Sequence, residues 1–312
     1  MIKFENARID VGGAPLISGL TLEEPGPHVA LVGGWNAWFR LLSADASLAA
    51  GTAELCGTRA EAAVREGVAG IALYDPPLPP RLRVSQYLEI GAALRGAPHK
   101  QSQKQAVEAL EHLELPKIAS RSIGDLSQLE RRGLSIAYAL LGPPQVVCLE
   151  TPLSELDVPA KAVVAALIDK VMQRAKLVVS VSRPQEDPAE RALLDRLGRV
   201  LVLERGALAA QGTVEEVIRP SSRYSVTVSR KGDAFVTALR SAGASVEAAT
   251  APRLATAILG TNAAASAERF VVELGEGQTS QVILQAAVGA QAPLIELLPL
   301  GLDARRAGMG GL

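Results

Sequence analysis

The sequence predicts a layered α/β domain followed by a smaller α+β unit. Segments with strand character alternate with segments of helical periodicity up to about residue 220, an order typical of α/β layers. One of these segments, Gln145–Leu149, is apolar after its first residue, as strands inside parallel sheets are. The pattern changes near residues 219–222, and we place a domain boundary there.

The elements of the first unit follow from apolar alternation for strands and from 3.6-residue periodicity for helices. Gly12-Gly13 separates the first two strands, and Pro143-Pro144 ends the helix before the apolar strand. The predicted strands are Phe4–Val11, Leu16–Leu22, His28–Val32, Gln145–Leu149, Leu177–Val181 and Val200–Leu203. The predicted helices are Phe39–Leu48, Val84–Leu94, Gln103–Leu113, Leu129–Leu141 and Ala160–Arg174.

The second unit is expected to be a small α+β sandwich. Its predicted strands are Tyr224–Val228, Ser245–Ala248, Arg269–Leu274 and Leu294–Leu298. Its predicted helices are Asp233–Ala242, Arg253–Leu259 and Ser280–Val288. We expect the glycine-containing tail, residues 305–312, to be flexible.

Composition excludes several classes of function. The chain has 32 basic and 33 acidic residues, a net charge of −1, whereas nucleic-acid binders normally carry a basic excess. Its 312 residues hold no apolar run of the roughly 18 residues that a membrane span needs. The N-terminus lacks an apolar signal segment, and the two cysteines, Cys56 and Cys148, lie in apolar surroundings. We expect a reduced, cytoplasmic protein.

Four segments carry a recognisable order of motifs. Pro143–Asp157 places an apolar strand before Leu-Glu-Thr-Pro-Leu-Ser-Glu-Leu-Asp, and Leu126–Leu134 reads Leu-Ser-Gln-Leu-Glu-Arg-Arg-Gly-Leu. Arg199–Ile218 contains two strand-like runs and Gly-Thr-Val-Glu-Glu, and Gly51–Gly57 follows the first predicted helix. These segments resemble the Walker B strand with its D-loop, the signature motif, the closing strands and the early strand pair of ABC transporter ATP-binding subunits.

The resemblance covers residues 2–218 and implies a P-loop-NTPase-like ABC ATPase domain at 1–219, with a helical subdomain at about 80–140. The unit at 220–304 stands where ABC-2-type exporters carry a small C-terminal domain. The loop Pro76–Pro80, followed by Arg81 and Arg83, corresponds to the region that faces the membrane subunit in the family. These assignments are expectations that the resemblance implies.

The residues that bind phosphate in the family are replaced. A P-loop cradles phosphates with backbone N–H groups and a Lys, but the matching stretch begins at Gly33-Gly34 and contains no Lys. Without a gap, Phe39 takes the Lys position and Arg40 the Ser/Thr position. The loop is alternatively shortened by about four residues. Neither alignment supplies the Lys, because no lysine occurs between Lys3 and Lys100.

The residues that hydrolyse ATP in the family are replaced as well. Glu150 stands at the Walker B carboxylate, and Thr151, which cannot act as a carboxylate base, at the catalytic Glu. Arg183 takes the place of the switch His, and Tyr74 or Asp75 that of the Q-loop Gln. The chain's histidines are His28, His99 and His112, all before the Walker B strand.

The signature motif keeps Ser127 but has Gln128 and Leu129 at its glycines and Glu130 at its Gln. A carboxylate is electrostatically unfavourable beside a triphosphate, so the site that this chain would complete for a partner is compromised. In the D-loop, Ser154 and Asp157 match the family pattern.

Simpler roles remain open for several of these residues. Trp35 and Trp38 are most simply core or interface residues. Ser127 is most simply a helix N-cap. Glu150 is a metal ligand or only a buried or salt-bridged carboxylate, and Asp157 caps or braces a dimer-facing loop.

The sequence therefore predicts a non-catalytic, pseudo-ATPase subunit of an ABC transporter. We expect it to pair with an active ABC ATPase subunit and to dock on a transmembrane permease subunit, at the cytoplasmic face of the inner membrane. No catalytic residue, metal site or cofactor is expected, and ATP with Mg²⁺ would bind weakly or only at a partner's site. Two alternatives are an ATP-binding subunit with a locked, non-hydrolysing site, and an interaction protein independent of any transporter.

Overall fold

The computed structural model describes residues 1–182, 184, 187–217, 223–249, 267–275 and 278–299. The chain forms two compact units, Met1–Val217 and Ile218–Arg305. None of the helices in the described part of the chain combines the length and the apolar character that a membrane-spanning segment requires.

A six-stranded sheet forms the centre of the first unit, with the strand order β10-β9-β3-β8-β7-β6. The pairs from β9 to β6 are parallel and β10 is antiparallel to β9. Its strands are β3 (His28–Gly33), β6 (Ala69–Ala72), β7 (Val146–Leu149), β8 (Lys176–Val181), β9 (Arg199–Glu204) and β10 (Ala207–Thr213). All four residues of β7 are buried, as its apolar sequence predicts.

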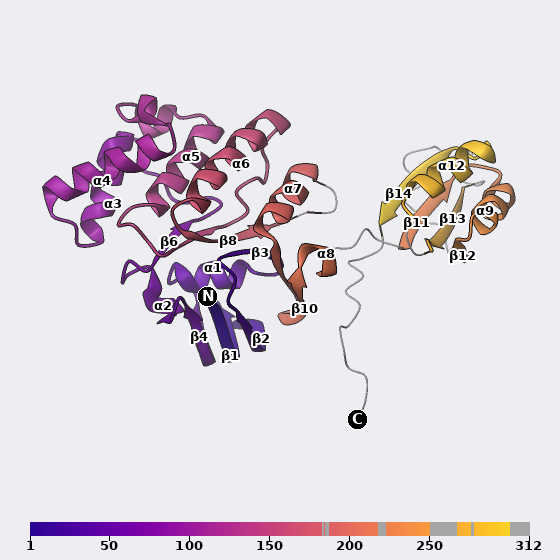
Figure 1. The fold of residues 1–312 in the computed structure, drawn as a ribbon, viewed down its shortest axis with the longest axis horizontal. Coiled ribbons are helices and arrows are strands. Elements are labelled where there is room, and N and C mark those ends of the chain that lie inside the picture. The colour runs from indigo at the N-terminus through magenta and orange to yellow at the C-terminus, as the bar shows by residue number, and fades with distance from the viewer. Residues whose placement is uncertain (183, 185–186, 218–222, 250–266, 276–277, 300–312) are drawn as a thin grey trace. The chain divides into compact units, whose positions relative to one another are not determined.

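A second, antiparallel sheet of four strands has the order β2-β1-β4-β5. Its strands are β1 (Ile2–Val11), β2 (Ala14–Glu24), β4 (Ser47–Leu55) and β5 (Thr58–Arg59). The apolar side chains of its inner face join those of the six-stranded sheet in one buried cluster. The cluster also takes in helix α1 (Asn36–Leu42), which lies between the two sheets (Figure 1).

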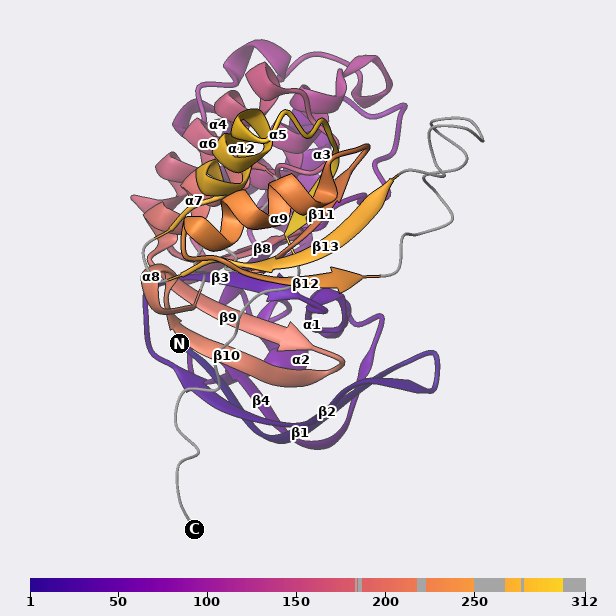
Figure 2. The ribbon, with the colours of Figure 1, turned by 90° about the vertical axis from the view of Figure 1, so that its right-hand side faces the viewer.

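Helices cover the other side of the six-stranded sheet (Figures 1 and 2). They are α3 (Val84–Leu94), α4 (His99–His112), α5 (Gln128–Ala139), α6 (Val158–Met172) and α7 (Pro188–Leu197), and the short helices α2 (Ala60–Ala63) and α8 (Val214–Val217) complete the unit. Helix α5 lies directly on β6, because a Cβ added at Gly70 would stand 1.7 Å from the Ala139 carbonyl oxygen. Only glycine permits this approach.

The second unit is a four-stranded antiparallel sheet with the order β12-β13-β11-β14. Its elements are β11 (Arg223–Val228), α9 (Gly232–Ser241), β12 (Ser245–Ala249), β13 (Glu268–Glu273), α12 (Gln281–Gly289) and β14 (Leu294–Pro299). This order is the split β-α-β arrangement of ferredoxin-like folds. Phe235 of α9 and Ile283 of α12 share a core with Val226 and Val272 of the sheet.

The predicted succession of strands and helices is confirmed for most of the described chain. The predicted helix Phe39–Leu48 is wrong at both ends, because α1 begins at Asn36 and ends at Leu42. Ala44 adopts a positive φ of 64°, which stops the helix, and β4 then begins at Ser47. Strand β6 and helix α7 were not predicted. The predicted helix Arg253–Leu259 and the tail lie outside the described residues.

An ion pair between a buried carboxylate and a partly exposed arginine joins the two sheets of the first unit. Glu24, at the end of β2, is fully buried, and its Oε2 accepts a 2.9 Å hydrogen bond from Nη2 of Arg199, which begins β9. The Gly26 N–H and the Gln211 amide also donate to this carboxylate. Burial opposes ionisation of Glu24, but the hydrogen bonds from Arg199, Gly26 and Gln211 outweigh it, so the pKa of Glu24 is lowered on balance.

The variant Glu24→Gln tests this link between the sheets. We expect the free energy of unfolding at neutral pH, measured by urea denaturation, to fall by about 2 kcal/mol, because the charged acceptor of Arg199 is lost. The folded-state pKa of Glu24 lies below its ordinary value of 4.5, so its stabilisation is present above that pH and is lost as the pH falls below it.

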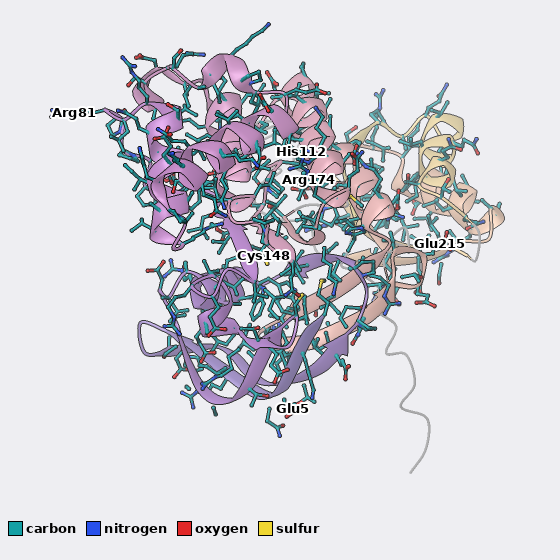
Figure 3. The ribbon with its side chains drawn as sticks, turned by 60° about the vertical axis from the view of Figure 1, so that its left-hand side comes forward. Glu5, Arg81, His112, Cys148, Arg174 and Glu215 are labelled. Atoms are coloured by element: carbon teal, nitrogen blue, oxygen red, sulfur yellow. The ribbon has the colours of Figure 1, made fainter. Side chains whose placement is uncertain are left out.

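The matched control is Glu5→Gln, because Glu5 forms an exposed ion pair with Lys3 on the outer side of the same sheet (Figure 3). We expect no measurable change in stability there. Equal stability of Glu24→Gln and the wild-type chain at neutral pH would contradict the role of the pair with Arg199.

Candidate functional site

The connection between β3 and α1 is where the sequence resemblance predicts a phosphate-binding loop. Two residues, Gly34 and Trp35, join the end of β3 at Gly33 to the start of α1 at Asn36. Gly33 has a φ of +95°, and a Cβ there would stand 2.0 Å from the Leu203 carbonyl oxygen. The turn is therefore pressed against β9, and its length fits the shortened-loop alignment.

Hydrogen bonds within the chain use the backbone N–H groups of this turn. Gly34 donates to the Leu203 carbonyl at 3.3 Å, and Trp35 donates to the Gly33 carbonyl at 2.8 Å. The Ala37 N–H donates to the Asn36 side chain at 2.9 Å. A phosphate cradle needs such N–H groups turned toward the ligand. In this chain these three are turned toward protein acceptors.

Aromatic side chains fill the space behind the turn. Trp35 and Phe39 are each 1% exposed and Trp38 is fully buried, so the core interpretation of the two tryptophans is confirmed. The rings of Trp38 and Phe4 pack edge to face with centroids 5.1 Å apart. The Trp35 indole N–H donates to the Leu201 carbonyl at 3.3 Å. Phe39 therefore lies in the core, and the next residue, Arg40, is exposed.

A hollow of about 590 Å³ lies beside the C-terminal half of α1. The residues that line it are Val11, Gly12, Phe39, Arg40, Ser43, Asp45, Leu73, Tyr74, Asp75 and Glu150. Among these described lining residues, Arg40 is the single cation, against three carboxylates. The electrostatic balance of the hollow disfavours a polyphosphate.

The two residues after β7 are held by neighbouring loops. Cys148 marks this buried strand in Figure 3. Glu150 Oε2 accepts a 3.0 Å hydrogen bond from the Tyr74 N–H. Thr151 has a positive φ of 37°, and its N–H donates to the Ser180 hydroxyl at 2.9 Å. Glu150 is thus a hydrogen-bonded carboxylate, and no group of three or more potential metal ligands occurs within the described ranges.

Side chains of Ser127 and Glu130 cap the N-terminus of α5. Ser127 is the N-cap, as predicted, and accepts from the Glu130 N–H at 3.3 Å. The Glu130 carboxylate accepts from both the N–H and the hydroxyl of Ser127 and pairs with Arg121. These contacts lower the pKa of Glu130, and the hydrogen bond from the Ser127 N–H has the largest effect. A negative charge therefore occupies the end of the helix that favours anions. Gln128 and Leu129 form the first turn of the helix.

The segment after Thr151 is tied to the loop beyond β8. The hydroxyls of Ser154 and Ser182 are 2.8 Å apart. Asp157 is the N-cap of α6 and accepts from the Ala160 N–H at 2.9 Å. Arg183, at the switch position, lies outside the described residues.

Three residues at this edge of the fold were not predicted from sequence. Arg132 donates to the Tyr74 carbonyl, Glu155 lines two hollows together with Tyr74, and Arg121 pairs with Glu130. Arg132 and Tyr74 are 58 residues apart in sequence. Sequence periodicity indicates which face of a helix is apolar, and it does not indicate which distant loop a buried Arg will meet.

Comparisons with known proteins agree with the resemblance. No family model matches the chain. The molybdenum import ATP-binding protein ModC of Mycobacterium tuberculosis is 30% identical over 167 residues, covering 51% of this chain and 43% of that protein. The Fe(3+) ions import ATP-binding protein FbpC of Streptomyces coelicolor is 26% identical over 232 residues, which cover 72% of this chain and 65% of that protein. The chain thus spans less than two thirds of the length of these curated relatives.

Solved structures show the same fold. The dimeric ATP-binding cassette MJ0796, bound to ADP and Pi, has a TM-score of 0.57 at 18% identity and covers 69% of this chain and 99% of its own. The protein cbiO1 of Clostridium perfringens also has a TM-score of 0.57, at 19% identity. At these identities the likeness concerns the fold alone. Together with the sequence matches, it shows that the chain is distantly similar to ATP-binding cassette proteins and has their α/β fold.

Proposed function

We propose that the chain is a pseudo-ATPase, a subunit of an ABC transporter that keeps the cassette fold without its chemistry. The observation that carries the proposal is the two-residue connection from β3 to α1, filled by the buried Trp35. A phosphate site needs a longer glycine-rich loop and a Lys that reaches the terminal phosphates. The sequence supplies no lysine between Lys3 and Lys100.

The residues that would activate water support the same proposal. Thr151 stands in place of a carboxylate base, and its N–H is bound to Ser180. Loss of one preorganised electrostatic contact costs about 10²–10³ in rate. Losing the Lys, the carboxylate and the His together leaves negligible turnover, even though such losses are not additive.

A partner subunit would supply the nucleotide chemistry in this proposal. We propose a heterodimer with an intact ATP-binding cassette, since two copies of this chain would hold no working site. The solved MJ0796 cassette is a dimer, and ModC and FbpC are named import ATP-binding proteins. Glu130 at the start of α5 disfavours the partner's triphosphate across such an interface.

The membrane-facing surface in this proposal is the segment after Tyr74. Residues 76–80 include four prolines, and Arg81, which projects from the surface in Figure 3, follows them. Docking needs shape rather than catalysis, so this surface survives the loss of the ATP-binding residues. The subunit would then lie at the cytoplasmic face of the inner membrane, bound to a permease subunit.

Equilibrium binding of ATP to the purified chain tests the proposal. We expect no heat of binding in calorimetry at millimolar ATP, with or without Mg²⁺, because the turn offers its N–H groups to protein acceptors. The melting temperature should also stay unchanged, since a ligand that binds the folded state stabilises it. Micromolar binding would overturn the proposal in favour of a subunit whose nucleotide stays bound without hydrolysis.

Restoring the two carboxylates of the hydrolytic site is a second test. The double variant Glu150→Asp, Thr151→Glu places the family's residues after β7. We expect its phosphate release from ATP to equal that of the wild-type chain, because the phosphate-binding loop is still missing. The single variant Glu150→Asp serves as the matched control. A tenfold rise in turnover in the double variant would show that the shortened turn still positions ATP.

A further inference from the structure

Tyr74 lies where three parts of the first unit meet, between the end of β6 and α3. It lines the hollow beside Arg40 and two further hollows, of about 660 and 690 Å³. One of these lies along α5, and the other lies along Thr151 and α6. The Tyr74 side chain is therefore a wall shared by all three.

The main chain of Tyr74 connects β7 to α5. Its N–H donates to Glu150 Oε2 at 3.0 Å, and its carbonyl accepts from Nη1 of Arg132 at 2.6 Å. Glu150 directly follows β7, and Arg132 lies in the second turn of α5. A single residue thus spans the distance between the strand and the helix.

The ring of Tyr74 holds the same arginine. Arg132 is only 7% exposed, and its guanidinium carbon lies 5.0 Å from the centre of the Tyr74 ring. Its Nε makes no hydrogen bond to the described residues. Burial of a guanidinium is costly unless other groups compensate for lost water. The Tyr74 carbonyl and ring, with the nearby carboxylates of Asp75, Glu155 and Glu150, provide that compensation.

The hydroxyl of Tyr74 reaches the third part. Tyr74 and Glu155 line the same two hollows, and the nearby Glu155 carboxylate is the main reason that the pKa of Tyr74 is raised. Glu155 lies in the segment between β7 and α6 and has a positive φ of 59°. The carbonyl, ring and N–H of one residue therefore hold β7 and α5 together, and its hydroxyl lies near the segment 151–157.

We propose that Tyr74 is a built-in latch that holds these three parts in one arrangement without nucleotide. In a site that binds a nucleotide with Mg²⁺, the metal and the phosphates are the charges that join separate loops. Here the joining charges are Arg132, Glu150 and Glu155, with Tyr74 between them. This inference rests on the proposed function for its meaning, but its contacts are independent of whether ATP binds.

The consequence is that the conformation of the chain does not change when nucleotide is added. A ligand shifts a conformational equilibrium only by binding one state more tightly than the other. Because the latch already connects β7, α5 and the segment 151–157, the chain presents one fixed surface to a partner. Tyr74 is thus a positioning residue, acting through Arg132 and Glu155.

Amide hydrogen exchange of the full chain, read by mass spectrometry, tests the latch. In Tyr74→Ala we expect exchange in residues 127–132 and 151–157 to accelerate by about tenfold or more, because local opening becomes easier. In Tyr74→Phe, which keeps the ring and the main chain, only residues 151–157 should accelerate. Millimolar ATP with Mg²⁺ should leave the wild-type pattern unchanged.

The matched control is Tyr87→Ala, because Tyr87 stacks on Tyr138 elsewhere among the helices, with centroids 5.0 Å apart. We expect it to leave residues 151–157 unaffected. Wild-type exchange rates in both segments of Tyr74→Ala would overturn the latch. If Tyr74→Ala does not fold, wild-type exchange rates in residues 151–157 of Tyr74→Phe would overturn the latch instead. Binding of ATP in calorimetry would instead refute the proposed function and leave these exchange results standing.

Discussion

The packing of α1 between the two sheets is the constraint on which the first unit depends. Trp35 and Trp38 are buried there against Phe4 of β1, and Gly33 brings the preceding turn against the Leu203 carbonyl. Large aromatic side chains contribute much of the apolar area of a core. The helix can approach both sheets this closely because only two residues connect it to β3.

This packing and phosphate binding place opposite demands on the same turn. A phosphate loop must stand away from the sheet and turn its N–H groups toward the ligand. In this chain the turn lies on β9. The N–H groups of the turn and of the start of α1 donate hydrogen bonds to main-chain carbonyls and to the Asn36 side chain. The same exchange recurs at α5, where Glu130 takes up the donors at the helix start. At both places, acceptors within the protein take up N–H groups of the kind that a phosphate would need.

Sequence periodicity was sufficient to predict the alternation of strands and helices, because burial of one face leaves a repeat of two or 3.6 residues. It failed at the end of α1, where a positive φ at Ala44 breaks an apolar pattern that continues past Leu42. The motif positions of the candidate site followed from the resemblance. The position of Tyr74 beside Arg132 and Glu155 did not, because it brings together segments that lie far apart in sequence.

The most direct test of the account uses the chain's two tryptophans, Trp35 and Trp38, which both lie at the turn in question. Their fluorescence reports on that turn without any added label. The account predicts blue-shifted emission with little quenching by acrylamide, and the same spectrum after addition of millimolar ATP with Mg²⁺. A red shift, or a change in quenching that saturates with ATP, would mean that the turn opens to admit nucleotide, and would contradict the account.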